Sequence, residues 1–328
     1  MLLRKKEEIE AWLNQYQIKN YELIEDQEYV YIVNVNGYVY LKSKDLKSID
    51  VKFNIVKGDF ICSNNQLKSL KGCPKIVEGN FNCSYNELKS LEYCPQVVSK
   101  SFYCNDNQLK TLEGCPKIIE GHFHCSYNEL LTLKGSPEII KGEFDCSYNF
   151  LTSLKYSPKI VGSDFDCSAN ELISLKGCQK IINRNFFCNE NKLKLLEYGP
   201  EIVHNDFICY SNRLTTLKGG PKIVKGFFNC SMNDLISLKY CPEIVEGSFY
   251  SMNNLLTIDE LKYLPKEING NYINVTKNEK LGYLQFITNF NELQKKVEEI
   301  FQIKEEKENL LNSINKEDLN KNKTLNKI

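Results

Sequence analysis

Residues 121–141, GHFHCSYNELLTLKGSPEIIK, and residues 142–162, GEFDCSYNFLTSLKYSPKIVG, are two consecutive copies of one sequence unit. The unit recurs along most of the 328-residue chain, and its clearest marker is a cysteine that returns every 21 residues from Cys62 to Cys230. Phenylalanine stands two positions before each of these cysteines, asparagine three after it, and leucine five and eight after it. A fixed period of this length is typical of a solenoid, in which each unit packs only on its neighbours.

The order of residues within the unit predicts how one coil is built. The Phe-x-Cys step alternates like a short strand whose Phe and Cys side chains both point inward. The asparagine follows this strand, where its amide can satisfy backbone groups of the turn and of the adjacent coil. The two leucines fill the core, and the proline and the aliphatic pair after it begin an extended return path. A 21-residue coil leaves no room for a full helix on that path.

The 14 cysteines are interpreted as buried, reduced thiols. Stacked coils would place successive thiols about 4.8 Å apart, which suggests disulfide or metal chemistry. Parallel ladder side chains do not meet the torsions of a disulfide, however, and zinc sites favour close Cys-x-x-Cys pairs. Buried cysteine serves well as a small hydrophobic residue. Five more cysteines precede the proline position and are assigned to the core as well: Cys73, Cys94, Cys115, Cys178 and Cys241.

The charge balance and the N-terminal sequence limit where the protein can be located and which classes of partner it can bind. Lys plus Arg and Asp plus Glu both total 42, so there is no global basic field to attract nucleic acid or anionic lipid. The first residues, MLLRKKEEIEAWLNQ, lack an apolar stretch of signal-peptide length, and no later run approaches the length of a membrane span. We therefore expect a cytoplasmic protein that binds neither nucleic acid nor membrane.

The pattern F-x-C-x-x-N-x-L-x-x-L-x-x-C-P resembles the short bacterial-type leucine-rich repeat, which has its asparagine and proline in the same phase. Two departures mark a divergent form: Phe-x-Cys replaces the aliphatic strand pair, and the return segment is one residue longer. The resemblance implies a leucine-rich-repeat solenoid with a curved parallel β-sheet of about 10–12 short strands and extended, non-helical return segments. It also implies a recognition surface, although a fold alone does not specify a function.

Four segments are predicted along the chain. Residues 1–36 form a cap, in which Ile9, Trp12, Leu13 and Tyr16 follow helical spacing and residues 29–35 alternate as a strand before the turn at residues 36–37. The repeat array covers residues 37–277. Residues 278–311 are expected to form a helical cap that begins at a capping box of Asn289 and Glu292, or a helix that binds a partner or a second copy. Residues 312–328 are expected to be disordered.

Function is expected at the outward-pointing strand positions, which flank each inward phenylalanine. On three consecutive coils these positions hold the acidic patch, which we define as His122, His124, Glu143, Asp145, Asp164 and Asp166. Like charges on adjacent strands cost stability and raise carboxylate pKa values unless a cation offsets them. A basic protein partner is the preferred explanation. A solvated face without a specific role, and a divalent-metal or acid/base site, stay open as alternatives.

Aromatic and apolar side chains extend this candidate surface in both directions along the array. Tyr103 flanks the acidic patch, and Tyr85, Tyr127 and Tyr148 form a partial stripe one position beyond the repeated serine. The alternative for this stripe is packing within the turn. The second half of the array is more apolar, with Phe187, Ile208, Phe227 and Tyr250 at outward positions. Tyrosine is enriched at interface hot spots, so a binding face with two different halves is predicted.

These observations favour a non-catalytic, protein-binding scaffold that uses the outward face of the repeat sheet. No catalytic residue, resident metal or cofactor is predicted, because a regular strand surface offers no deep pocket. The expected partner is another protein, with a basic patch as one possibility, and the oligomeric state is left open. Two alternatives from other classes are a metal-assisted hydrolase at His122, His124, Asp145 and Asp166, and a self-assembling structural protein.

Overall fold

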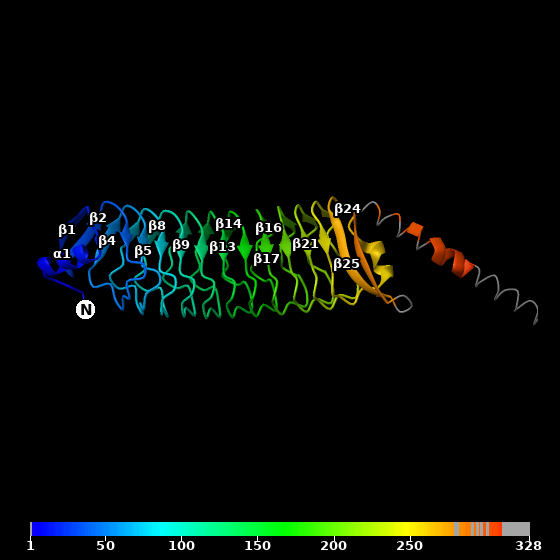
Figure 1. Cartoon of the computed structure of the whole chain (residues 1–328), viewed down its shortest axis with the longest axis horizontal. Helices are drawn as coiled ribbons and strands as arrows, with labels where there is room; N and C mark the ends of the chain where they lie inside the picture. The colour runs from blue at the N-terminus through cyan, green and yellow to red at the C-terminus, as the bar shows by residue number, and fades with distance from the viewer. Residues whose placement is uncertain are drawn as a thin grey trace, which may run out of the picture.

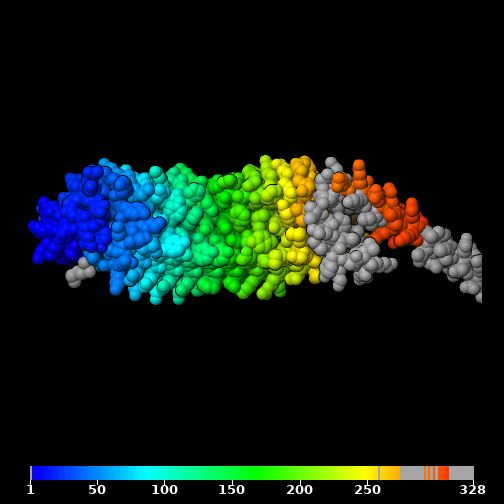
Figure 2. Space-filling view, in the orientation of Figure 1, coloured from blue at the N-terminus to red at the C-terminus, as the bar shows by residue number. Residues whose placement is uncertain are grey.

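The computed structural model is a long solenoid whose coils stack along one axis, which is close to straight in the view of Figure 1. The space-filling view in Figure 2 has the same rod-like outline. The structure describes residues 2–278, 282–289, 292, 295, 298–299 and 302–309. The predicted solenoid class is confirmed, and each coil contains two short strands joined by turns instead of a helix.

The main sheet contains the Phe-x-Cys segments and has 13 strands, of which all except the last are parallel. Each phenylalanine pairs in register with the phenylalanine 21 residues away, as between Phe123 and Phe144. The parallel strands are β3 (Val39–Tyr40), β5 (Phe60–Ile61), β7 (Phe81–Asn82), β9 (Phe102–Tyr103), β11 (Phe123–His124), β13 (Phe144–Asp145), β15 (Phe165–Asp166), β17 (Phe186–Phe187), β19 (Phe207–Ile208), β21 (Phe228–Asn229), β23 (Phe249–Tyr250) and β25 (Asn271–Asn278).

The return segments form parallel strands of their own on the other side of each coil. These strands fall into three separate sheets, of five, three and five strands, the first of which includes the N-terminal hairpin. The return strands are β4 (Phe53–Val56), β6 (Ile76–Val77), β8 (Val97–Val98), β10 (Ile118–Ile119), β12 (Ile139–Ile140), β14 (Ile160–Val161), β16 (Ile181–Ile182), β18 (Ile202–Val203), β20 (Ile223–Val224), β22 (Ile244–Val245) and β24 (Glu267–Ile268). The predicted extended return path is confirmed.

The core between the two sides contains a column of phenylalanines and a column of cysteines. Successive rings from Phe60 to Phe249 have centroids 5.0–6.0 Å apart, and each ring is fully buried. All 14 cysteines are unpaired. Burial raises the pKa of the thiols from Cys83 to Cys230 in the ladder well above the ordinary value, which keeps them neutral. These thiols therefore pack as hydrophobic groups.

A ladder of buried asparagines joins the coils just beyond the main sheet. In a central coil, Asn149 Nδ2 donates to the carbonyl oxygens of Cys125, Cys146 and Ser147 at 3.0–3.2 Å. Asn149 Oδ1 accepts a hydrogen bond of 2.9 Å from the backbone N–H of Leu130 in the preceding coil. One buried side chain thus satisfies backbone groups of two coils. The predicted asparagine ladder is confirmed.

Each coil turns through two positions with left-handed backbone. The first follows the serine of the repeat and holds Tyr127 and Tyr148, both with φ of 51°. The second lies two residues before the proline position of the repeat and holds either glycine or tyrosine, as in Gly177 (φ 106°) and Tyr156 (φ 70°). A Cβ on Gly177 would lie 2.1 Å from the carbonyl oxygen of Leu154, so that coil requires glycine. Side chains at both turns are directed away from the core.

The N-terminal cap closes the first coil with a helix and a β-hairpin. Helix α1 (Lys6–Gln15) buries Ile9, Trp12 and Leu13, as predicted, and Trp12 packs against Phe53 with ring centroids 6.2 Å apart. The predicted strand is β2 (Val30–Val35), which runs parallel to β4 in the return sheet. Strand β1 (Tyr21–Asp26) pairs with β2 in antiparallel fashion and was not predicted.

The C-terminal end of the array differs from the prediction. Strand β26 (Gly282–Asn289) pairs antiparallel with β25 and ends the main sheet, so a hairpin occupies the start of the predicted helical cap. The predicted boundary at residue 277 also falls within β25. Helical conformation is described at residues 292, 295, 298–299 and 302–309, and Lys304 forms an ion pair with Asp259. The predicted tail at 312–328 lies outside the described residues.

Asp259 and Glu260 lie in the 3-10 helix η1 (Ile258–Tyr263), where the coil is two residues longer than the 21-residue period. This insertion keeps Phe249 and Tyr272 in register on adjacent strands despite their spacing of 23 residues. In the described part of the chain, no helix is both long enough and apolar enough to cross a membrane.

Candidate functional site

The candidate surface is the outer face of the main sheet, which we call the sheet face. It consists of the residue before and the residue after each inward phenylalanine. The residues after each phenylalanine are all partly buried, because neighbouring strands crowd them: Ile61, Asn82, Tyr103, His124, Asp145, Asp166, Phe187, Ile208, Asn229 and Tyr250. Every predicted strand residue of the acidic patch lies on this face, on β11, β13 or β15 or just before them.

In eight of the ten coils from Phe60 to Phe249, the residue before the phenylalanine is not free, contrary to our interpretation of the sequence. Its side chain accepts a hydrogen bond from the backbone N–H of the equivalent residue in the next coil. Asp59, Asp164 and Asp206 accept in this way through Oδ1 at 2.7–3.0 Å. The same bond is made by Asn80, Ser101, His122, Asn185 and Ser248. The side chains of Asp164 and His122 therefore help to hold the coils together.

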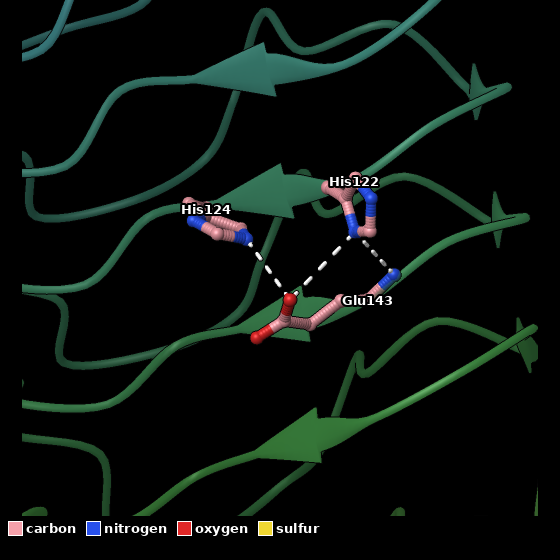
Figure 3. Close-up of side chains that lie close together, drawn as sticks. All are labelled: His122, His124 and Glu143. Carbon is pink, nitrogen blue, oxygen red and sulfur yellow. Dashed lines mark hydrogen bonds and ion pairs between the residues drawn. The ribbon is translucent and has the colours of Figure 1, made fainter. Parts of the chain in front are cut away.

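Glu143 occupies this position without continuing the ladder. No hydrogen bond from the backbone N–H of Asp164 to Glu143 is present among the described residues, whereas each aspartate at the position makes one. The glutamate side chain is one methylene longer and turns back toward the preceding coil. Its carboxylate Oε2 lies 3.7 Å from His122 Nδ1 and 3.5 Å from His124 Nε2. Figure 3 marks both contacts with dashed lines.

The aspartates after the phenylalanine form a local turn. Asp145 Oδ1 accepts from the backbone N–H and the hydroxyl of Ser147, at 3.0 and 2.6 Å. Asp166 Oδ1 accepts from the N–H of Ser168 at 2.8 Å. Asn82 and Asn229 make the equivalent backbone bond in other coils with a neutral amide. Coils with Ile61, Phe187 or Ile208 at this position form the same turn without a side-chain oxygen, so the turn does not need the negative charge of Asp145 and Asp166.

Burial and crowding perturb the ionisation of the patch. Burial raises the pKa of Asp166 to about 6, and the nearby carboxylates of Asp145 and Glu143 add to this effect. Burial lowers the pKa of His124, but the Glu143, Asp145 and Asp166 carboxylates outweigh it and the net pKa is raised. The His124 imidazole in turn holds the pKa of Glu143 below its ordinary value. The patch is an environment that favours a bound positive charge.

The predicted tyrosines divide into three groups. Tyr103 packs edge-on against His124, with ring centroids 5.2 Å apart, so it borders the acidic patch directly. Tyr127 and Tyr148 stack face to face at 4.2 Å, and 51% and 46% of their surfaces are exposed. Their exposure argues against packing within the turn. Tyr85 is also exposed but lies two coils before Tyr127, with Asp106 at the position between them.

The second half of the sheet face is more apolar, as predicted. Phe187 on β17 is paired in register with Asp166 on one side and Ile208 on the other, so the apolar half begins beside the acidic patch. Phe227 and Tyr250 pack edge-on with centroids 6.1 Å apart. Of these four residues only Phe227, at 46% exposure, is largely open to solvent.

Two features of this surface were missed from the sequence. Arg184 Nε lies 3.9 Å from Asp164 Oδ1, which partly balances the negative end of the patch. A second set of exposed tyrosines occupies the left-handed position two residues before the proline of the repeat: Tyr93, Tyr156, Tyr198 and Tyr240. The sequence could have predicted this set, because tyrosine replaces glycine at the same position of the 21-residue repeat.

Replacing Glu143 by aspartate is expected to stabilise the array by about 0.5–1 kcal/mol. The shorter side chain should accept from the Asp164 N–H, as Asp59, Asp164 and Asp206 accept in their coils. Urea unfolding followed by circular dichroism measures the change. Glu143→Gln is the control, because it keeps the length of the side chain and should not restore the bond; equal stability of the two variants would contradict the argument.

The sequence finds no match among protein-family models or curated proteins. Among solved structures, the chain is similar to the leucine-rich repeat domain of APL1B, with a TM-score of 0.43, 13% identity and coverage of 80% of this chain and 92% of that chain. It is also similar to YopM from Yersinia enterocolitica WA-314, with a TM-score of 0.38, 15% identity and 74% coverage of each chain. The chain is a leucine-rich-repeat-type solenoid, and its own 21-residue period, strand register and asparagine ladder carry that assignment.

Proposed function

We propose that this chain is a non-catalytic scaffold whose sheet face binds another protein, with a Lys- or Arg-rich segment of that protein placed against the acidic patch. The observation that carries the proposal is the surplus charge of Asp145 and Asp166. In other coils, Asn82 and Asn229 accept the same hydrogen bond from the serine N–H with a neutral side chain, so the fold does not need the two carboxylates. The described residues give no support to the hydrolase or to self-assembly.

The surplus charge costs stability in the free protein. The raised pKa of Asp166 means that its ionised form, which predominates at neutral pH, costs free energy in the folded protein, because burial and the Asp145 and Glu143 carboxylates oppose it. A cationic side chain from a partner would offset this cost in the complex, where the pair is further shielded from water. Charge that is costly alone and favourable when bound is typical of a recognition site.

Neighbouring aromatic residues supply the apolar contact that a charge pair lacks. Tyr103 borders the patch, and the stacked pair Tyr127–Tyr148 stands exposed at the adjacent turn. Rigid aromatic side chains bury large areas at small entropic cost and dominate the energetics of many interfaces. We propose that the partner covers these tyrosines and continues toward Phe187. The unpaired thiols support a reducing compartment, so the proposal includes a cytoplasmic location.

The experiment is an affinity capture from a lysate of the source cells with quantitative mass spectrometry. The intact chain is compared with the double variant Asp145→Asn, Asp166→Asn, which preserves the turn hydrogen bonds. We expect a defined protein to be retained by the intact chain, to be lost at high salt, and to be depleted at least about tenfold on the double variant. The captured protein is then purified and its affinity for both forms is measured directly.

The matched control is Glu120→Gln, Glu138→Gln. It removes the same two charges from the opposite side of nearby coils, where each glutamate forms an exposed ion pair with a lysine. This control should retain the partner, since exposed pairs of this kind contribute little. Equal retention on all three forms would exclude the acidic patch as the binding site, and purified proteins that fail to associate would contradict the scaffold itself.

A further inference from the structure

His122, His124 and Glu143 form the one group of three or more His, Cys, Asp or Glu side chains with metal-ligand spacing in the described part of the chain. The two histidines flank Phe123 on β11, so their side chains emerge on the same face of the sheet. Glu143 lies just before β13, next to His122 in the register of the paired strands. Figure 3 shows all three side chains pointing toward one another.

The distances suit a metal ion with only small movements. The three candidate ligand atoms all lie within 4.8 Å of one another, and Glu143 Oε2 is 3.7 Å from His122 Nδ1 and 3.5 Å from His124 Nε2. Ligands in a tetrahedral zinc site, with bonds of about 2.0–2.1 Å, are roughly 3.3 Å apart. A shift of a few tenths of an ångström in these flexible side chains therefore brings the two nitrogen–oxygen pairs to ligand spacing.

The hydrogen bonding of the two imidazoles shows which ring nitrogens could bind a metal ion. His124 Nε2 is shielded from solvent and has no hydrogen-bond partner in the described structure, although Glu143 Oε2 lies nearby. A shielded ring nitrogen without a partner is costly, and a metal ion would satisfy it. His122 Nδ1 accepts a long hydrogen bond of 3.2 Å from the backbone N–H of Glu143, so this nitrogen is unprotonated, and binding a metal ion through it would replace that hydrogen bond.

We propose that His122 Nδ1, His124 Nε2 and the Glu143 carboxylate bind one divalent transition-metal ion on the sheet face, with Zn²⁺ as the reference ion. Two imidazoles and one carboxylate favour Zn²⁺, Ni²⁺, Co²⁺ or Cu²⁺ over Mg²⁺ and Ca²⁺, which prefer all-oxygen sites. Three protein ligands leave a fourth position that faces solvent. The inference is independent of the proposed protein partner, since it concerns ligand atoms of this chain alone.

Glu143 does not continue the backbone hydrogen-bond ladder, and this departure is the structural argument that its carboxylate serves as a metal ligand. Every aspartate at this position continues the ladder, whereas Glu143 gives up that bond and reaches the two histidines. The chain contains only three histidines, and two of them meet at this one place. The adjacent Asp145 and Asp166 add negative charge that further favours a bound cation.

The test is titration of the full-length, chelator-treated protein with Zn²⁺, followed by calorimetry and by competition with a chromophoric zinc indicator. We expect one site per chain in the wild type, insensitive to millimolar Mg²⁺, and a loss of affinity of at least about 100-fold in His124→Ala and in Glu143→Gln. Circular dichroism confirms that each variant is folded. Zn²⁺ should also raise the melting temperature of the wild type but not of His124→Ala.

The matched control is His204→Ala, which removes the third histidine, an exposed residue of a distant coil. This variant should bind Zn²⁺ as the wild type does. Co²⁺ spectra distinguish nitrogen and oxygen ligands from the cysteines, because a thiolate ligand gives an intense charge-transfer band that this site should lack. Equal Zn²⁺ affinity of the wild type and His124→Ala, or a thiolate band in the Co²⁺ spectrum of the wild type, would overturn the proposal.

Discussion

Replacing Asn149 by alanine is expected to lower the free energy of unfolding by about 3 kcal/mol. Leu130 lies in the core behind the turn. The substitution removes the acceptor of its backbone N–H, which has no other partner among the described residues. It also removes a donor from the carbonyl groups of Cys125, Cys146 and Ser147. A buried backbone group left without a partner costs its full desolvation energy, so this effect exceeds that of an ordinary surface change.

Urea unfolding measures this effect with two probes. Far-UV circular dichroism reports on the whole array, whereas the single tryptophan, Trp12, reports on the N-terminal end. Because coils contact only their neighbours, a weakened central interface should let the two halves unfold separately. We expect the two transitions of Asn149→Ala to differ in midpoint. Asn14→Ala makes the same truncation on the exposed side of α1 and should change stability by less than about 0.5 kcal/mol.

The ladder argument would fail if Asn149→Ala were as stable as Asn14→Ala. Asn149→Asp separates the two roles of the side chain, since a carboxylate still accepts from the Leu130 N–H but cannot donate to the three carbonyl groups. We expect this variant to be destabilised too, and to recover partly at acidic pH, where the protonated carboxyl regains one donor.

The regular part of the fold was predictable because the repeat places the same residue types at the same positions nine or ten times. The inward Phe-x-Cys step and the asparagine ladder both follow from hydrogen-bonding and packing demands that each coil repeats. The ends of the array lack this repetition. At the C-terminal end, a helical capping signal at Asn289 and Glu292 was extended backward over residues that pair with the open edge of β25 instead.

The candidate site shows a different limit of sequence-based prediction. Alternation along the strand correctly placed His122, His124 and Asp166 on the outer face. It could not separate side chains that serve the next coil from side chains that are free, because both kinds are polar and point outward. Asp164 and His122 bond a backbone N–H 21 residues away, and only the three-dimensional stacking reveals that bond. Glu143 differs from Asp164 by one methylene, and this difference decides which contact it makes.

Asp166→Asn is expected to stabilise the protein at neutral pH by about 1–3 kcal/mol. Burial, with help from the Asp145 and Glu143 carboxylates, raises the pKa of Asp166 from 3.8 to about 6. An asparagine removes the buried charge and keeps the acceptor for the Ser168 N–H, as Asn82 does for Ser84. Because the Asp166 side chain is only partly buried, the expected gain lies below the full value of the shift.

The sign of the pH dependence follows from proton binding in the two states. Below about pH 4 the carboxyl is protonated in both the folded and the unfolded chain, so Asp166→Asn and the wild type should be about equally stable. Between about pH 4 and 6 the folded state holds a proton that the unfolded state has lost, and this contribution to the free energy of unfolding falls as the pH rises. Above about pH 6 the penalty of the wild type is complete.

The measurement is therefore the difference in unfolding free energy between Asp166→Asn and the wild type as a function of pH, in the presence of a chelator so that a metal ion cannot offset the charge. Titrating groups that do not interact with Asp166 are common to both proteins and cancel in this difference. His124, whose pKa the Asp166 carboxylate helps to raise, titrates above the window from pH 4 to 6. The exposed Asp234→Asn should give a difference near zero at every pH. A constant difference for Asp166→Asn from pH 4 to 7 would mean that packing, and not charge, distinguishes the two side chains. A difference that opens between pH 4 and 6 would establish that the folded chain maintains a carboxylate at a cost in stability, which is the condition on which recognition of a cationic partner at this face depends.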